Sequence, residues 1–284
     1  MKDKLSFLSF LLIFSSSLLW LGCSDATEAP IDEVADMTPA QPEPGEMVLI
    51  PAGEFIMGSD LERTPPLEVP EHTVELPAYY IDVYEVTHGE WIRFLTENDY
   101  SPEGDWRRFY NIGKEDHPVG NVTWEDARTY CEAAGKRLPT EAEWEKAGRG
   151  TDGLKYPWGE VWESKANTEE HGMRNSIEVG EMAEDKSPFG VYDMMGNSQE
   201  WTADKLEPYP DNPDRRNESF RRDFIAVRGG SYAMRGRSMA LYMRSAYLMD
   251  AQYGIGFRCV RDSEKAVQEG EEDQAEGSEG EEEE

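Results

Sequence analysis

The sequence predicts a single α+β domain with a large irregular fraction. Three segments begin with a threonine that is followed three residues later by an acid, a pattern typical of helix starts. Short apolar runs bounded by proline and glycine indicate strands. Aromatic residues make up 11% of the chain, which is too many for a polypeptide without a core. We therefore expect one compact domain in which a few helices accompany a small antiparallel sheet.

The helices are predicted from their amino-terminal caps. A threonine hydroxyl and the following carboxylate can satisfy the free backbone N–H groups of a first turn. Glycine is expected to end the second helix at Gly135 and the third at Gly148. Cys131 shares a face of the second helix with Ala127, which directs the cysteine toward the core. The capping pairs are Thr87 with Glu90, Thr123 with Asp126, and Thr140 with Glu143.

Strands are predicted where short apolar runs lie between turn-forming residues. The segment from Tyr156 to Arg222 is rich in Asn, Gly, Pro, Trp and charged residues, so we expect it to be irregular. The predicted strands are residues 47–50, 54–57, 73–76, 80–86, 225–228 and 256–261.

The amino terminus has the features of an export signal. Lys2 and Lys4 precede an apolar stretch at residues 5–21, and Gly22 and Cys23 follow it. This end resembles the lipobox of bacterial lipoproteins, whose cleavage leaves a diacylated cysteine. We expect a signal peptide at residues 1–22 and a lipid on Cys23, with an ordinary cleaved signal or an uncleaved anchor as the alternative. Ser24 favours the outer membrane, so the predicted location is extracytoplasmic and lipid-anchored.

The net charge of −31 is concentrated at the two ends of the chain. Residues 24–46 hold seven acids and no base, and residues 264–284 hold eleven acids and one lysine. Such composition predicts an acidic tether at residues 23–46 and a disordered tail at 263–284, on either side of a folded domain at 47–262. The acidity excludes a nucleic-acid partner, and the mean hydropathy of −0.72 excludes a polytopic membrane protein.

The chain has three cysteines, Cys23, Cys131 and Cys259. If Cys23 carries a lipid, the other two remain in a compartment where disulfides persist. We expect them to pair, and two buried free thiols are the alternative.

The part of the chain expected to fold contains an ordered series of short motifs. They are Gly53-Glu54-Phe55-Ile56-Met57-Gly58, Tyr84-Glu85-Val86-Thr87, His117-Pro118-Val119, Arg137-Leu138-Pro139-Thr140-Glu141-Ala142-Glu143-Trp144-Glu145, Gly196-Asn197, Glu200-Trp201-Thr202, Arg228-Gly229-Gly230-Ser231-Tyr232 and Gly256-Phe257-Arg258-Cys259. Over about residues 46–262, this series resembles the formylglycine-generating enzyme (sulfatase-modifying factor) family. The resemblance implies a variant of the C-type-lectin-like fold. It also implies that Cys131 and Cys259 match one of the family's two disulfides, and the second has no counterpart here.

The resemblance also indicates what chemistry is missing. Oxidases of the family bind Cu(I) through two cysteines after the Gly-Gly-Ser motif, and Met234 and Met239 occupy those positions here. Without thiolates the oxidase lacks its ligands, so copper is not expected. The alternative is an atypical thioether site for Cu(I), against which stands the common use of methionine to fill irregular apolar space.

Two structural calcium sites are implied by the same family. The first would use Asn167 and the backbone carbonyl of Thr168, although its later ligands fall in a shortened loop. The second would combine oxygen ligands of the kind that Ca²⁺ prefers. A plain Gly-Asn turn with solvated acids is the alternative. The ligands of the second site are the side chains of Asp193 and Glu200 and the backbone carbonyls of Gly196 and Ser198.

Together these features predict a lipid-anchored, extracytoplasmic binding or envelope-assembly module that has lost formylglycine-generating activity. Its partner is expected to be a protein or peptide. The expected contact surface is the former substrate groove near Arg228, Ser231 and Tyr232. The alternative function is a metal-dependent oxidoreductase with a methionine-containing site.

Overall fold

The computed structural model describes residues 42–250 and 253–263. The signal peptide at 1–22, Cys23, most of the tether and the tail beyond Ser263 lie outside the described residues, and their assignments stay predictions. Within the described ranges, none of the helices has the length and apolar character that a membrane crossing requires.

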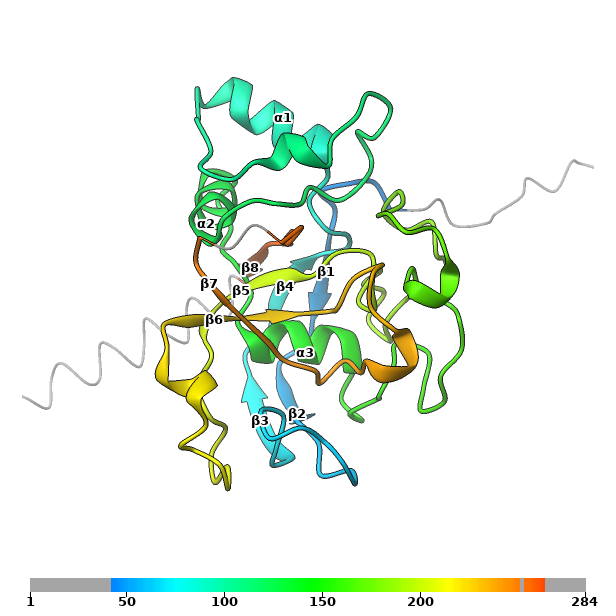
Figure 1. Cartoon of the computed structure of the whole chain (residues 1–284), viewed down its shortest axis with the longest axis vertical. Coiled ribbons are helices and arrows are strands. Elements are labelled where there is room, and N and C mark those ends of the chain that lie inside the picture. Colours follow the sequence, from blue (N-terminus) through cyan, green and yellow to red (C-terminus); the bar gives the residue numbers. More distant parts are fainter. Residues whose placement is uncertain (1–41, 251–252, 264–284) are drawn as a thin grey trace, which may run out of the picture. The chain divides into compact units, whose positions relative to one another are not determined.

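Each α-helix of the described part begins at its predicted cap. The hydroxyls of Thr87, Thr123 and Thr140 accept the N–H of the third helical residue at 3.2, 3.1 and 3.1 Å. The acid at that residue accepts the threonine N–H in return, which confirms all three capping boxes. The helices are α1 (His88–Glu97), α2 (Trp124–Ala133) and α3 (Glu141–Arg149), with short 3-10 turns η1 (Trp106–Arg108), η2 (Glu169–His171), η3 (Glu218–Arg221) and η4 (Gly236–Ser238) (Figure 1).

The predicted end of α3 is wrong. Helix α2 stops before Gly135, which has a φ of 67°, but α3 runs through Gly148 to Arg149 and ends at Gly150. A Cβ on Gly148 would lie 3.0 Å from a Leu241 methyl carbon. Glycine at this position therefore allows close helix packing and does not terminate the helix.

The strands of the described part form three small antiparallel sheets, where we expected one. In the first, the order is β1-β4-β8; the second pairs β2 with β3; the third has the order β5-β6-β7. Helix α3 lies against β2, β5 and β6 near the middle of the domain (Figure 1). The strands are β1 (Met47–Ile50), β2 (Gly53–Met57), β3 (His72–Leu76), β4 (Tyr79–Asp82), β5 (Glu200–Lys205), β6 (Phe224–Arg228), β7 (Ser245–Leu248) and β8 (Val260–Asp262).

Two strands were not predicted, and two were predicted too long. Strand β5 falls in the segment expected to be irregular, and β7 follows a methionine-rich run that has no alternating pattern. Both exist because they pair with the two sides of β6. The run at 80–86 is a strand only up to Asp82, within β4, and the run at 256–261 is a strand only at Val260 and Arg261, the first two residues of β8.

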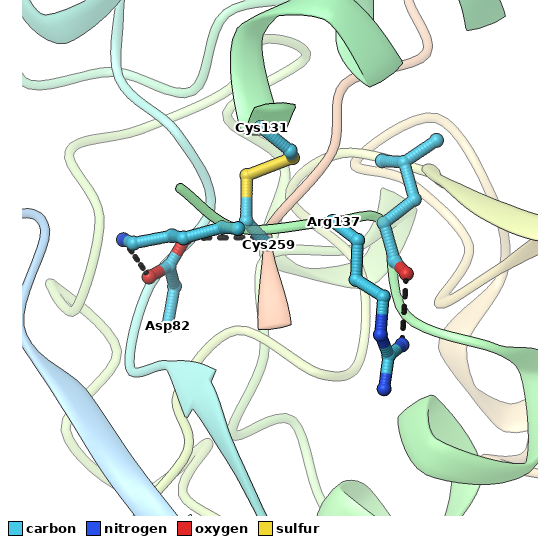
Figure 2. The surroundings of a disulfide bond; sticks show 6 residues. Asp82, Cys131, Arg137 and Cys259 are labelled. Atoms are coloured by element: carbon cyan, nitrogen blue, oxygen red, sulfur yellow. Dashed lines mark hydrogen bonds and ion pairs between the residues drawn. A yellow bond between two sulfur atoms is a disulfide. The ribbon is translucent and has the colours of Figure 1, made fainter. Parts of the chain in front are cut away.

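A disulfide links α2 to the residue just before β8 and lies within one of the two main apolar cores. Cys131 and Cys259 are fully buried, their Cα atoms are 5.7 Å apart, and they are bonded through sulfur. The neighbouring Asp82 accepts the Cys259 N–H at 2.9 Å and pairs with Lys136 at 2.6 Å (Figure 2). The predicted pairing is thus confirmed, and the alternative of two free thiols is wrong.

The second core surrounds α3. Trp144 is fully buried there with Met194, Met239 and Leu241. This core brings the segment after the Gly-Gly-Ser motif against the helix that carries the Glu141-x-x-x-Glu145 pair. The residues on which the functional prediction depends therefore lie in and around it.

Candidate functional site

The Gly-Gly turn brings the two methionines of the copper-cysteine positions together. Gly229 and Gly230 have φ values of 91° and 77°, which favour glycine. A Cβ on Gly230 would lie 2.5 Å from Met239 Sδ and 3.6 Å from Met234 Sδ. Both sulfurs therefore approach the same backbone position. Met239 is buried and Met234 partly so.

Arg228 does not belong to an accessible groove, which corrects the prediction. Its side chain is fully buried and forms an ion pair with Glu145 of α3. It also donates to the carbonyls of Tyr242 and Met243 at 3.1 and 3.0 Å. A desolvated guanidinium whose two terminal nitrogens are engaged in this way supports the fold and is not free to contact a ligand.

Ser231 and Tyr232 are partly exposed, as a contact surface requires. Tyr232 lines a small pocket whose other wall comes from the loop after η1. Phe109, Lys114 and Gly254 also line this pocket, and the Phe109 ring lies close to the Gly254 backbone. Of the three predicted groove residues, Tyr232 lines this pocket and Ser231 does not, and the lining adds an aromatic and a cation that the sequence did not single out.

In the second predicted calcium site, one of the two carboxylate side chains has an oxygen without a partner in the part of the chain that the structure describes, and the other is already paired. Asp193 has a φ of 57°, its Oδ2 accepts the Gly180 N–H at 2.6 Å, and its Oδ1 is buried without a partner among the described residues. Glu200, in contrast, accepts two hydrogen bonds from Arg258 at 2.7 and 2.8 Å and one from Trp144 at 2.9 Å. The Glu200 carboxylate is already neutralised by Arg258.

Sequence reasoning missed two further buried acids that lie beside Asp193. Glu85 accepts hydrogen bonds from the Ser198 backbone and the Asn197 side chain, both at 2.9 Å. Asp185 accepts the Met195 N–H, and its Oδ1 has no partner in the described part of the chain. Glu85 belongs to the family-like motif Tyr84-Glu85-Val86-Thr87, which gave no indication of an acidic cluster, and Asp185 lies in a segment without a recognisable motif.

Burial perturbs the ionisation of this acidic cluster. Desolvation raises the pKa of Asp193 to about 7 and raises the pKa values of Glu85 and Asp185 well above the ordinary range. The guanidinium of Arg258 opposes this shift for all three, but it does not cancel it. A cluster of this kind is stabilised by protons or by an additional cation.

The first predicted calcium site adjoins the second. Asn167 Nδ2 donates to Asn197 Oδ1 at 3.1 Å, and the Asn197 N–H donates to the Asn167 carbonyl at 2.9 Å. A Cβ on Gly196 would lie only 2.3 Å from that carbonyl. Asn167 Oδ1 is buried without a partner among residues of the described ranges, and Thr168 is fully buried. No group of three or more His, Cys, Asp or Glu side chains in those ranges is arranged to hold a metal ion.

The small sheets surround helix α3, and the Gly-Gly turn packs against Trp144 of that helix. This α+β domain is of the formylglycine-generating-enzyme type. The chain belongs to the sulfatase-modifying factor enzyme 1-like family, whose profile matches residues 33–263.

Relatives and solved structures agree with this assignment. The formylglycine-generating enzyme of Bos taurus is 30% identical in an alignment that covers 77% of this chain and 75% of the bovine protein. A mouse protein named inactive C-alpha-formylglycine-generating enzyme 2 is 30% identical over 57% of this chain and 70% of its own length. The structure of PvdO from Pseudomonas aeruginosa superposes with a TM-score of 0.62 and 26% identity, covering 78% of this chain and all of PvdO.

Proposed function

We propose that this chain is a binding or envelope-assembly module of its family and does not convert a sulfatase cysteine to formylglycine. The supporting observation is the state of its sulfur atoms. Cys131 and Cys259 are joined in a buried disulfide, and thioethers occupy positions 234 and 239. The described domain therefore offers no thiolate to Cu(I), which the oxidase branch of the family needs. The inactive mouse relative shows that the family includes proteins named as lacking the activity.

The proposed contact surface is the small pocket that Tyr232 lines, together with the partly exposed Ser231 that precedes Tyr232 in the chain. Phe109 gives it an aromatic wall and Lys114 a positive charge, features that suit an extended peptide with an acidic or carbonyl-rich segment. Ile112, 94% exposed on the same loop, and Tyr253, 75% exposed next to Gly254, extend the apolar area. The proposed partner is an extracytoplasmic protein or peptide.

The activity test compares the natural chain with a variant that regains thiols. Each is incubated with a peptide carrying the sulfatase motif, Cu(I) and O2, and conversion of the peptide cysteine to an aldehyde is followed by mass spectrometry. The natural chain is expected to be inactive, and its conversion of the peptide would disprove the proposal. The Met234→Cys/Met239→Cys variant shows whether the remaining site still presents a peptide to copper.

A thioether copper site is the second candidate, favoured by the approach of both sulfurs to Gly230. Thioethers bind Cu(I) in oxidising compartments. A Cu(I) titration of the natural chain against Met234→Ala/Met239→Ala decides between ligation and packing. Tight binding that the double substitution abolishes supports the copper site, and equal behaviour of the two proteins removes it.

We also propose that Ca²⁺ binds where the two predicted calcium sites adjoin. The unpartnered Oδ1 atoms of Asn167 and Asp193 fit a hard cation, and so does the excess of buried acids around Asp193. Glu200 fits less well, because Arg258 holds both of its oxygens. When bound, Ca²⁺ would stabilise the 193–200 turn and take no part in a reaction. Calorimetry with Ca²⁺ should detect a site that Asp193→Asn weakens, and EGTA should lower the Tm; an unchanged Tm counts against the site.

The lipid anchor is proposed from the sequence alone. Cys23→Ser should abolish metabolic labelling with a fatty acid and release the protein from the membrane fraction. Labelling that persists in the variant would refute the anchor without bearing on the binding surface.

A further inference from the structure

A second cavity, of about 520 Å³, lies between the β2–β3 loop and the segment after η4. Its walls are residues 61–65, 237–240, 242 and 243, together with Glu68 and Lys155. It shares no lining residue with the Tyr232 pocket, so its role is independent of the proposed peptide surface. A volume of this size is typical of sites for small organic ligands.

The inner end of this cavity carries a carboxylate that is only half satisfied. Glu68 is 2% exposed, and its Oε1 accepts the Arg244 N–H at 3.0 Å. Its Oε2 is buried and has no partner within the described ranges. Burial raises the pKa of Glu68, and the nearby Arg228 and Arg244 only partly offset this. A donor that reached Oε2 would relieve the cost of burying it.

Basic side chains outnumber acids among the accessible residues of the lining, although the chain as a whole carries a charge of −31. Arg63, Lys155 and Arg237 line the cavity together with one exposed acid, Glu62. Only Arg237 among these bases has an acidic partner in the described part of the chain, an exposed contact with Glu170 at 3.3 Å. Lys155 lies over the Tyr156 ring at 5.3 Å. The excess of positive charge in this part of the lining is suited to a carboxylate.

Apolar side chains also line this cavity, in addition to the carboxylate and the basic groups. Met239 and Tyr242 are buried there, and Met243 is half-buried beside them. Methionine adapts to side chains of different shape. Leu61, on the opposite loop wall, is 54% exposed, and a ligand reaches the buried Oε2 only when this wall moves.

We propose that this cavity binds a small zwitterion, either a free α-amino acid or a dipeptide. The ligand's ammonium group donates to Glu68, its carboxylate contacts the basic groups of the lining, and its apolar side chain rests on Met239, Met243 and Tyr242. One molecule of this class accounts for all three features of the lining. A ligand with a single charge would leave either the acid or the cations without a counterpart.

The test measures binding of probes that differ by one charged group. The full chain is titrated by calorimetry with L-leucine, L-methionine and the dipeptide Leu-Leu, and then with 4-methylpentanoate and 3-methylbutylamine, which lack the amino and the carboxyl group of leucine. We expect at least one zwitterion to bind, and each single-charge analogue of leucine to bind about tenfold or more weakly than the zwitterion. If the amino acids bind more tightly than Leu-Leu, the ligand is a free amino acid; if Leu-Leu binds more tightly, it is a dipeptide.

Two variants test which charged end of the ligand contacts Glu68 and which contacts Arg63. Glu68→Gln keeps an acceptor for the Arg244 N–H, and it should weaken the zwitterion about tenfold while leaving 4-methylpentanoate unchanged. Arg63→Ala removes an exposed side chain and should weaken every carboxylate probe but not 3-methylbutylamine. The proposal is overturned if no zwitterion binds with a Kd below about 1 mM, or if 4-methylpentanoate binds as tightly as leucine. Equal binding of leucine by the natural chain and Glu68→Gln also overturns it.

Discussion

Removing the disulfide is expected to cost a large part of the stability of this domain. Cys131 and Cys259 are 128 residues apart in sequence. For a loop of this length, the chain-entropy relation gives about 5 kcal/mol at 25 °C, because the cross-link restricts the unfolded chain. Small domains have a total stability of about 5–15 kcal/mol, so the loss should be obvious.

The assay is urea unfolding of the natural chain in its oxidised and reduced forms, together with Cys131→Ala/Cys259→Ala. Reduction breaks the cross-link and keeps the sulfur atoms, so it isolates the entropic contribution. The alanine variant should lose more, because both cysteines are fully buried and their sulfurs leave space behind. Both uncrosslinked forms should also show a larger m-value, since their unfolded chains expose more surface. A reduced protein that loses less than about 1 kcal/mol would refute the argument.

Three other substitutions test the interior. Burial, and secondarily the charges of neighbouring groups, lowers the pKa of His88 to about 4 in the folded protein. Between about pH 6.5 and 4 the unfolded chain therefore holds a proton on His88 that the folded chain does not, and stability falls as the pH is lowered. This costs up to about 3 kcal/mol, and His88→Phe should remove that loss from the pH dependence of unfolding; an unchanged slope would contradict it. Gly236→Ala should destabilise by about 1–3 kcal/mol or more, because its Cβ would lie 1.9 Å from the Trp162 ring; a Tm equal to that of the natural chain argues against this overlap. Arg258→Met should cost about 3–5 kcal/mol by leaving Glu200 buried and unpaired, and the double variant with Glu200→Leu should recover part of it in a thermal melt.

Local structure could be predicted from the sequence, whereas the pairing of strands that are far apart in the chain could not. The three helices were predictable because a threonine and an acid three residues later contain the whole capping box. Strands β5 and β7 were not, because each depends on β6. The end of α3 was misplaced for the same reason: the packing of Gly148 against Leu241 is invisible in a local window.

The candidate site shows the same division. Positions 234 and 239 could be compared with the family by counting from the Gly-Gly-Ser motif, and the structure shows that their sulfurs lie near each other. The burial of Arg228 could not be anticipated, because its partner Glu145 is 83 residues away. The acids beside Asp193 also come together only in the fold, and each is engaged by backbone N–H groups from different turns.

The motifs that place this chain in its family are largely structural. Arg228 of the Arg-Gly-Gly motif pairs with Glu145, and Arg258 of the Gly-Phe-Arg-Cys motif pairs with Glu200. These side chains are fully buried, and breaking such a pair is costly, so they can be retained whether or not the domain performs chemistry. Cys259, from the same motif, forms the disulfide. A strong match to these motifs therefore supports the fold, whereas the proposed loss of oxidase activity depends on the two thioethers that replace the copper-binding thiolates.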